Sequence, residues 1–338
     1  MNLCLLASGM VTGVGLNSPA ACAAMRCAIT RVVETRFMIR GEWVMGSLVP
    51  LDGSPRGVVR LARMVVPAIR ECLAAITTKQ AQIPLVLIVA EPDRPGRMDD
   101  IDDSLWAAIE AEMGAFHPKS AMLPLGKAGI AQALMQARGL IQGGRVPAVL
   151  IAGVDTLLTA ASINAYFEKG RLLVPDNSDG FIPGEAGTAI LVGPDTGSGG
   201  LMVQGIGIAI EKATLESGDP LRGEGMANAI RAACKDGGAT MDDVDYRITD
   251  LNGEQYWFKE AALAIARTIR NVKKEFDLWH PADCIGEIGA AIGPAVLGVA
   301  MAAAKKGYAA GPGVLCHFGN DDGTRAALIV RQTSKRGA

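Results

Sequence analysis

The pattern of hydrophobic and polar positions predicts elements most clearly in residues 120–155. The elements predicted there are, in order, a strand (Ala121–Leu125), a corner (Gly126 and Lys127), a helix (Ala128–Ile141) and a second strand (Ala148–Ala152). The helix is apolar around most of its circumference, which is typical of a buried helix. The second strand is a continuous apolar run, as expected when both faces are covered. The chain therefore sets a helix N-terminus, with free N–H groups and the positive end of its dipole, at the edge of a buried sheet.

The same kind of pattern runs through the rest of the chain and repeats. In the first half, elements are predicted at Leu3–Met10, Ala20–Ala28, Val58–Ile76, Leu85–Val89, Leu105–Met113 and Ala189–Val192, with a polar, irregular stretch before Arg56. Their counterparts in the second half are Leu201–Ile210, Met226–Lys235, Tyr246–Leu251, Glu260–Val272, a helix from Gly286 to Ala304, Gly313–Phe318 and Ala326–Val330.

This repeat indicates a duplicated α/β unit, since about 150 residues is far longer than the ~20–50-residue periods of solenoids. We assign one half to residues 1–195 and the other to residues 196–338. Packing about an internal pseudo-twofold axis sets the two apolar helices back to back. Lys127 and Glu287, at the N-termini of these helices, are then expected to face one cleft.

Composition limits the function. The 338 residues are 49% hydrophobic but only 4% aromatic, and the net charge is −2, so nothing indicates a nucleic-acid partner or an anionic membrane. Seven cysteines occur without CxxC or metal-ligand spacing, which predicts free thiols in a reducing compartment and no metal or other cofactor. No cysteine lies between Cys72 and Cys234.

Neither of the two most membrane-like segments predicts membrane insertion. The N-terminal run Leu3–Leu6 lacks a basic region before it and soon breaks into glycines. The segment Ile288–Ala304 has no ionisable residue, but it is short for a span and contains Pro294. We therefore expect a cytoplasmic protein with no membrane span.

Several motifs occur in a characteristic order. They are Gly9–Gly15, Ala152–Asp155, Asp179–Ala186 (which includes Gly180, Gly184 and Glu185), Gly223–Met226 with Asp242–Tyr246, and Phe318-Gly319 with Asp322–Thr324. Together they resemble the β-ketoacyl-acyl-carrier-protein synthases of the thiolase superfamily, over about residues 3 to 330. The resemblance implies a thiolase-like, five-layered α-β-α-β-α duplication. It also implies a dimer formed through the strand at Ala121–Leu125.

The departures from this family concern its catalytic residues. Family members carry a cysteine at the N-terminus of the first buried helix, where the helix dipole favours the thiolate. That position falls at Lys127, or at Gly126 if the register slips by one residue. The two family histidines fall at Asn252 and Glu287. We therefore do not expect Cys-dependent Claisen condensation.

Lys127 has three interpretations. It points outward, or it forms a structural ion pair with Glu287, or it is a reactive amine with a lowered pKa that uses Glu287 as base. The first two are favoured together, because a site constellation on a known fold is weak evidence for new chemistry.

The remaining candidates have similar alternatives. Asn252 is either a donor to a substrate carbonyl oxygen or a turn residue before Gly253. Phe318, with Gly319, either gates an acyl tunnel or belongs to the core. His317 is a candidate as the imidazole nearest the expected cleft. Glu185 is expected to be a structural carboxylate.

Three hypotheses for function follow. The first is a non-condensing ketosynthase homologue that binds an acyl chain or acyl carrier protein, or that pairs with an active ketosynthase as chain-length-factor subunits do. The second is an acyltransferase or decarboxylase with altered chemistry at Lys127, Asn252 and Glu287, acting on an acyl thioester. The third is a structural component of a larger assembly. A homodimer and a heterodimer both fit. An apolar tunnel that ends at Lys127 would support the first two hypotheses. A site filled by side chains would support the third hypothesis.

Overall fold

The computed structural model describes residues 1–99, 101–144 and 146–335. Among these residues, ten strands form one mixed sheet in the order β10-β9-β11-β12-β8-β1-β7-β6-β4-β5. Their bounds are β1 Leu3–Val11, β4 Leu85–Val89, β5 Ala121–Pro124, β6 Val149–Thr156, β7 Glu185–Pro194, β8 Gly200–Ile210, β9 Tyr246–Thr249, β10 Leu278–Trp279, β11 Gly313–Gly319 and β12 Thr324–Thr333.

The two halves of this sheet have the same topology. β4 pairs in parallel with β5 and β6, and β9 pairs in parallel with β10 and β11. β7 joins β6 to β1 in antiparallel fashion, and β12 joins β11 to β8 in the same way. The halves meet where β1 and β8 pair antiparallel through Leu3 with Val203 and Cys4 with Met202. The predicted boundary at residue 195 falls in the turn between β7 and β8.

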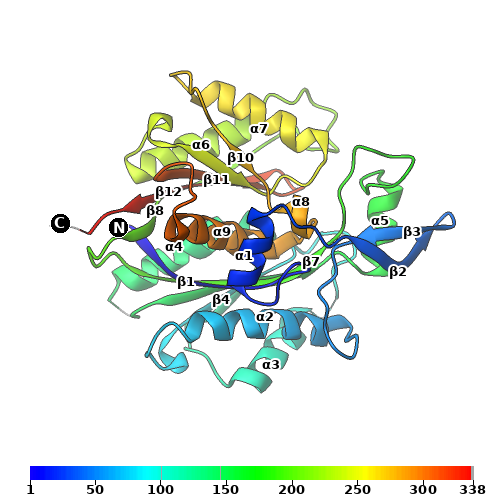
Figure 1. The fold of residues 1–338 in the computed structure, drawn as a ribbon, viewed down its shortest axis with the longest axis horizontal. Helices are drawn as coiled ribbons and strands as arrows, with labels where there is room; N and C mark the ends of the chain where they lie inside the picture. Colours follow the sequence, from blue (N-terminus) through cyan, green and yellow to red (C-terminus); the bar gives the residue numbers. More distant parts are fainter. Residues whose placement is uncertain (100, 145, 336–338) are drawn as a thin grey trace.

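The helices make the structure five-layered, as predicted (Figure 1). α2 and α3 cover the outer face of the first half, α6 and α7 cover the outer face of the second, and α4 and α9 lie between the two halves of the sheet. Helix bounds are α1 Ser18–Arg26, α2 Gly57–Leu73, α3 Ile101–Met113, α4 Gly129–Gln142, α5 Ala160–Glu168, α6 Glu224–Gly237, α7 Gln255–Thr268, α8 Ala282–Ile285 and α9 Ile292–Lys306. Short 3-10 turns lie at Gln80–Gln82, Met241–Asp243 and Gly289–Ala291.

The central layer holds the largest core. α4 and α9 bury small and branched side chains against strands of both halves. This close approach depends on glycine: a side chain at Gly153 of β6 would overlap the carbonyl oxygen of Ala290, and one at Gly293 of α9 would meet Ile130 of α4. α4 is less completely buried than its sequence predicts, because Gln132, Met135 and Gly139 are exposed along one face.

Three local predictions are wrong. The stretch before Arg56 contains a β-hairpin, β2 (Val33–Ile39) and β3 (Glu42–Gly46), whose two-residue turn at Arg40 and Gly41 has positive φ at both positions. The arginine at the first turn position hid this hairpin, since Asn or Gly is the usual signal there.

The second and third errors concern helix bounds. The helix predicted at Glu260–Val272 runs instead over Gln255–Thr268, because Trp257 belongs to its buried face. The last central helix begins at Ile292 and not at Gly286, because Glu287 is held against Pro183 by a bridge between extended segments.

No helix in the described part of the chain is long and apolar enough to cross a membrane. This holds for α9, whose apolar sequence reflects burial between the two halves of the sheet.

Candidate functional site

The site begins at the corner that leads into α4. Gly126 has φ +57°, a left-handed conformation that favours glycine. Its N–H donates to the carbonyl oxygen of Val89 (3.0 Å), and a side chain there would overlap the Glu91 carboxylate. This turn sets Lys127 just before the helix, where the N–H of Ala128 donates to Oδ1 of Asn320 (2.9 Å). An asparagine from the second half of the chain thus binds the residue that begins the buried helix of the first.

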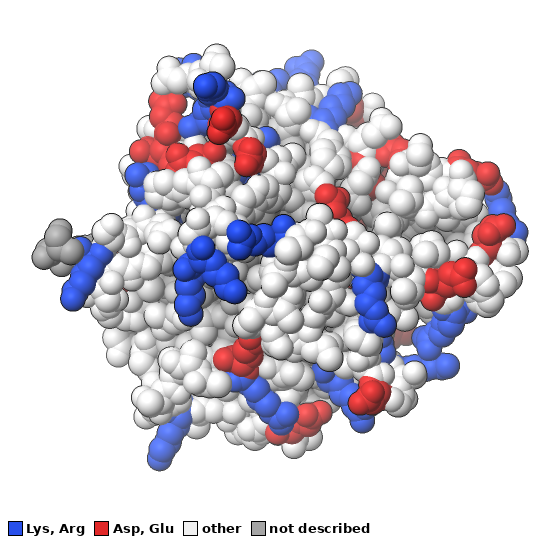
Figure 2. Space-filling model, viewed as in Figure 1, with Lys and Arg blue, Asp and Glu red and all other residues white. Residues whose placement is uncertain are grey.

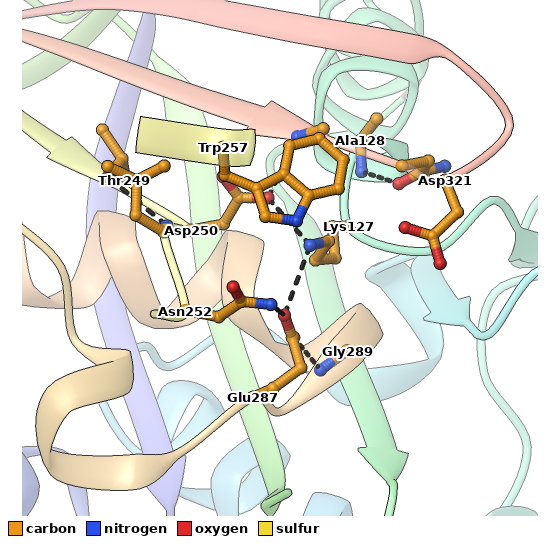
Figure 3. Close-up of polar contacts among 12 residues, drawn as sticks. Lys127, Ala128, Thr249, Asp250, Asn252, Trp257, Glu287, Gly289 and Asp321 are labelled. Atoms are coloured by element: carbon orange, nitrogen blue, oxygen red, sulfur yellow. Dashed lines mark hydrogen bonds and ion pairs between the residues drawn. The ribbon is translucent and has the colours of Figure 1, made fainter. Parts of the chain in front are cut away.

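Lys127 points inward, so the interpretation that it faces solvent is wrong. Its side chain is 11% exposed, and its Nζ lies 3.3 Å from Oδ2 of Asp250 and 3.3 Å from Oε2 of Glu287. The same Nζ lies 4.8 Å from the centroid of the Trp257 ring, within cation–π range. Figure 3 shows the ammonium group enclosed by these three side chains.

Lys127 is kept in its protonated, charged form by its neighbours. Burial by itself would lower the pKa of this amine, but the carboxylates of Glu287 and Asp250 outweigh it and raise the pKa above its ordinary value. A nucleophilic amine must be neutral. The arrangement therefore opposes the interpretation of Lys127 as a reactive amine with a lowered pKa.

Glu287 and Asn252 complete the predicted trio, and the structure brings all three together. The Asn252 amide donates to Oε2 of Glu287 (2.8 Å) and to Oε2 of Glu254 (3.1 Å). The N–H of Gly289 donates to the other oxygen of Glu287 (2.9 Å). The Asn252 donors are thus directed at carboxylates, which leaves them poorly placed to stabilise a substrate oxyanion.

A second group of charges, which the sequence did not indicate, surrounds this trio. Arg171 forms a two-point ion pair with Glu254, at 2.7 and 2.9 Å, and contacts Oδ2 of Asp321 at 2.6 Å. The Trp257 indole N–H also donates to Oε2 of Glu254 (3.0 Å). Of the site residues that the sequence prediction missed, Asp250 would have been the easiest to find, because it lies just past the end of a buried strand. Arg171 comes from the loop after α5, and no sequence signal marks it.

The first half contributes carboxylates from the ends of its own strands. Asp155, at the end of β6, pairs with Arg94 (2.6 Å) and accepts the N–H of Ala290 (3.2 Å). Burial raises the pKa of Glu91, just beyond β4, to about 7, with Asp155 adding to the shift and Lys127 and Arg94 opposing it. Ionisable side chains therefore converge here from both halves of the fold.

Little empty space remains among these groups. A cavity of about 30 Å³ lies between them, lined by residues that include Lys127, Glu287, Asp155, Arg171 and Asp321. A water molecule needs about 10–15 Å³ measured in this way, so the cavity holds two or three waters at most and not an acyl chain. In the described residues, no cluster of His, Cys, Asp and Glu could hold a metal ion.

The prediction that His317 lies near the cleft is wrong. His317 is 1% exposed, and neither ring nitrogen has a hydrogen-bond partner among the described residues. On β11, Cys316 and Phe318 pack in the central core, whereas Leu315 packs in the outer core under α6. Successive side chains of a strand point to opposite faces, so His317 shares the face of Leu315. His317 therefore faces that outer layer. Burial, followed by the charge of Arg247, lowers its pKa to about 3.

Phe318 is a core residue, fully buried in the central cluster, and it does not line the cavity. Gly319 donates its N–H to Oδ2 of Asp250 (3.0 Å), the same oxygen that faces Lys127. It thus supports the site through Asp250.

The predicted motif after α5 is structural. Glu185 accepts two contacts from Arg60, the Thr156 hydroxyl (3.0 Å) and the N–H of Val49 (2.9 Å). Other backbone segments pack closely against Gly180 and Gly184. A side chain at these positions would overlap backbone atoms of Leu172 and Ile285 respectively.

The arrangement of strands and central helices is that of the thiolase-like ketosynthases and chain length factors. No protein-family model matches the chain, and a search of curated proteins found no sequence match. Solved structures do match. A structure of a type II polyketide acyl-carrier protein in complex with its ketosynthase bound to the hexaketide aligns with a TM-score of 0.81 and 14% identity, over 98% of this chain and 99% of that chain.

Two further structures are similar. The ishigamide ketosynthase/chain length factor aligns with a TM-score of 0.77 and 16% identity, over 98% of this chain and 99% of that chain. The ketosynthase ApeO in complex with its chain length factor ApeC, from Xenorhabdus doucetiae, aligns with a TM-score of 0.74 and 13% identity, over 98% of both chains. At these identities the likeness establishes the fold, and the resemblance noted in the sequence is confirmed at that level.

Proposed function

We propose that this chain is a non-condensing subunit of the ketosynthase fold, which acts by pairing with an active ketosynthase. The observation that carries the proposal is the state of Lys127. An ammonium group held between Asp250 and Glu287 cannot take an acyl group while it stays protonated. The cavity beside it, about 30 Å³, has no room for an acyl chain. A filled site argues against acyl-chain binding and favours a role within an assembly, and pairing with an active ketosynthase is the form of assembly that we propose.

The similar structures support the choice of partner. Two of them contain a ketosynthase together with a chain length factor. β5 is the last strand of the sheet order, and among the described residues no strand pairs with its outer edge, which can therefore meet another chain. A pair of ketosynthase-fold subunits, one condensing and one not, is the assembly we assign to it.

Two measurements test this function. The first is intact-mass spectrometry of the purified chain and of a Lys127→Ala variant, after incubation with acyl and malonyl thioesters. We expect no adduct and no decarboxylated product from either protein. An adduct on the unmodified chain that disappears in the variant would establish covalent chemistry at Lys127 and overturn the proposal.

The second measurement concerns pairing. The chain is co-expressed with a cysteine-containing ketosynthase-fold chain from the same source, and the complex is weighed by native mass spectrometry. We expect one copy of each chain, and condensing activity that depends on both. Activity that is the same without this chain would contradict the role as a partner.

A further inference from the structure

A second cavity lies where α1, β10, α8 and α9 meet. Its volume is about 380 Å³, within the range of small-molecule sites. It shares no lining residue with the Lys127 site. Apolar side chains of Met25, Leu278 and Val299 form part of its lining. The cavity is therefore a separate feature that the ketosynthase-type site does not explain.

One wall of this cavity is aromatic. The Trp279 ring packs at 4.8 Å from the buried ring of Tyr246, which fixes its inner side. It lies nearly parallel to the ring of Tyr308, with centroids 6.3 Å apart and planes at 28°. Trp279 and Tyr308 both line the cavity and both remain partly exposed. Their rings present a fixed aromatic surface to a ligand, with which another planar ring packs favourably.

Arg26 brings a positive charge to the cavity. The Arg26 guanidinium carbon lies 4.3 Å from the centroid of the Tyr308 ring. Stacking of this kind occupies the face of the guanidinium and leaves its N–H edges free to bind a carboxylate. The carboxylate that lines the cavity, Asp283, lies 2.9 Å from Nδ1 of His280, and 69% of its side chain is exposed to solvent. Among the described residues, Arg26 has no carboxylate within salt-bridge distance.

The surroundings reinforce this charge. Arg26 ends α1, and Lys305 and Lys306 end α9. Figure 2 shows Lys and Arg side chains gathered near the centre of the face over these two helix ends. The local field therefore favours an anion and disfavours a cationic aromatic ligand.

We propose that this cavity binds a small aromatic carboxylate. The ligand's ring packs against Trp279 and Tyr308, and its carboxylate accepts hydrogen bonds from the edge of Arg26. The inference is independent of the proposed function, because it uses no residue of the Lys127 site and no partner chain.

The test is calorimetric titration of the full chain with naphthoate and with naphthalene methanol, which has the same ring system and no charge. Arg26→Gln is expected to weaken naphthoate binding about tenfold and to leave the neutral alcohol unchanged, because only the charge-assisted pair is lost. Trp279→Leu is expected to weaken both ligands. Arg231→Gln, on the exposed side of α6, is the matched control and should change neither.

Two results would overturn the proposal. One is the absence of saturable naphthoate binding by the unmodified chain at millimolar concentration. The other is equal naphthoate affinity in Arg26→Gln and Arg231→Gln. Because Arg26 is exposed at the end of a helix, its substitution leaves the core intact, and thermal unfolding of each variant verifies this. The Arg26 comparison therefore stays decisive even if Trp279→Leu fails to fold.

Discussion

At Lys127, tertiary neighbours reverse the usual electrostatics of a helix N-terminus. A cation there is ordinarily unfavourable by about 0.3–1 kcal/mol. Here two carboxylates lie 3.3 Å from its Nζ, and both come from the second half of the chain. The three groups form a buried cluster in which each charge depends on the others, because a buried charge without a partner is strongly destabilising.

Removal of the cation should therefore cost much more than loss of a surface pair. We expect Lys127→Met to lower the free energy of unfolding by about 3–5 kcal/mol, because Asp250 and Glu287 are left unpaired. Adding Glu287→Gln should restore part of this loss. Urea unfolding at pH 7 measures both effects. Lys169→Met, which breaks the exposed pair with Glu216, is the control and should cost at most about 1 kcal/mol. Equal losses for Lys127→Met and the control would disprove the cluster.

Lys127 itself should not make stability depend on pH in the neutral range. An amine whose folded-state pKa is raised contributes stability that is complete below its unfolded pKa, here 10.5, and is lost only as the pH rises through the folded value. Between pH 6 and 9 its contribution is constant. Any pH dependence in that range has another source.

Glu91 is such a source. Burial raises its folded pKa to about 7 from 4.5, so the folded state holds a proton that the unfolded state has released. Stability should then fall as the pH rises from about 4.5 through 7. Glu91→Gln removes this group, and we expect the loss of stability between pH 5 and 8 to shrink by about 1–3 kcal/mol. Glu112→Gln, at an exposed position, is the control. Parallel pH profiles for all three proteins would refute the assignment.

At the scale of elements, the local sequence pattern was enough to predict some elements, whereas contacts with distant segments set the bounds of others. The strand at Leu85–Val89 was predicted residue for residue, because a short apolar run bounded by turn residues has one stable arrangement in a covered sheet. The start of α9 was misplaced, because Glu287 is held in extended backbone by a segment far away in the sequence. The hairpin of β2 and β3 was missed, because its turn lacks the usual residues.

Close contact between elements depends on glycine at the centre of the fold. We expect Gly153→Ala to lower the free energy of unfolding by about 1–3 kcal/mol or more, because the added methyl group overlaps the Ala290 carbonyl. Gly139→Ala, in α4, meets no atom within 4 Å and should raise stability by about 0.5–1 kcal/mol through helix propensity. Thermal and urea unfolding compare the two. A neutral Gly153→Ala would mean that the central layers can separate to admit a methyl group.

At the scale of the whole molecule, the surface beside β5 is where we expect a second chain to bind. β5 is the outermost strand of its half, and the adjacent helix α4 leaves Met135 48% exposed. An exposed apolar side chain next to a free strand edge is typical of a surface that is covered in an assembly.

A charge placed there should prevent pairing without unfolding the chain. We expect Met135→Lys to abolish or strongly weaken two-chain complexes, whether of this chain with itself or with an active ketosynthase. Light scattering after size-exclusion chromatography measures the mass. Val59→Lys changes a side chain on α2 that is 55% exposed and should have no effect. If both variants pair normally, the interface lies elsewhere.

By itself, the sequence determined the duplicated α/β plan and the two buried helices, and it led us to expect no Cys-dependent condensation. These features depend on local pattern and on residue identity, which a linear chain displays directly. The sequence also predicted that Lys127 and Glu287 would meet, because the repeat relates their two helices.

Only the tertiary structure decided what that meeting means. Asp250, Trp257 and Arg171 reach the site from separate loops, and burial joins them into a network that fixes the charge on Lys127 and leaves about 30 Å³ empty. The direction of His317 was likewise decided by the pleat of β11 within the assembled layers. Desolvation and charge pairing arise only when distant segments exclude water together, so no pattern along the chain could have revealed them.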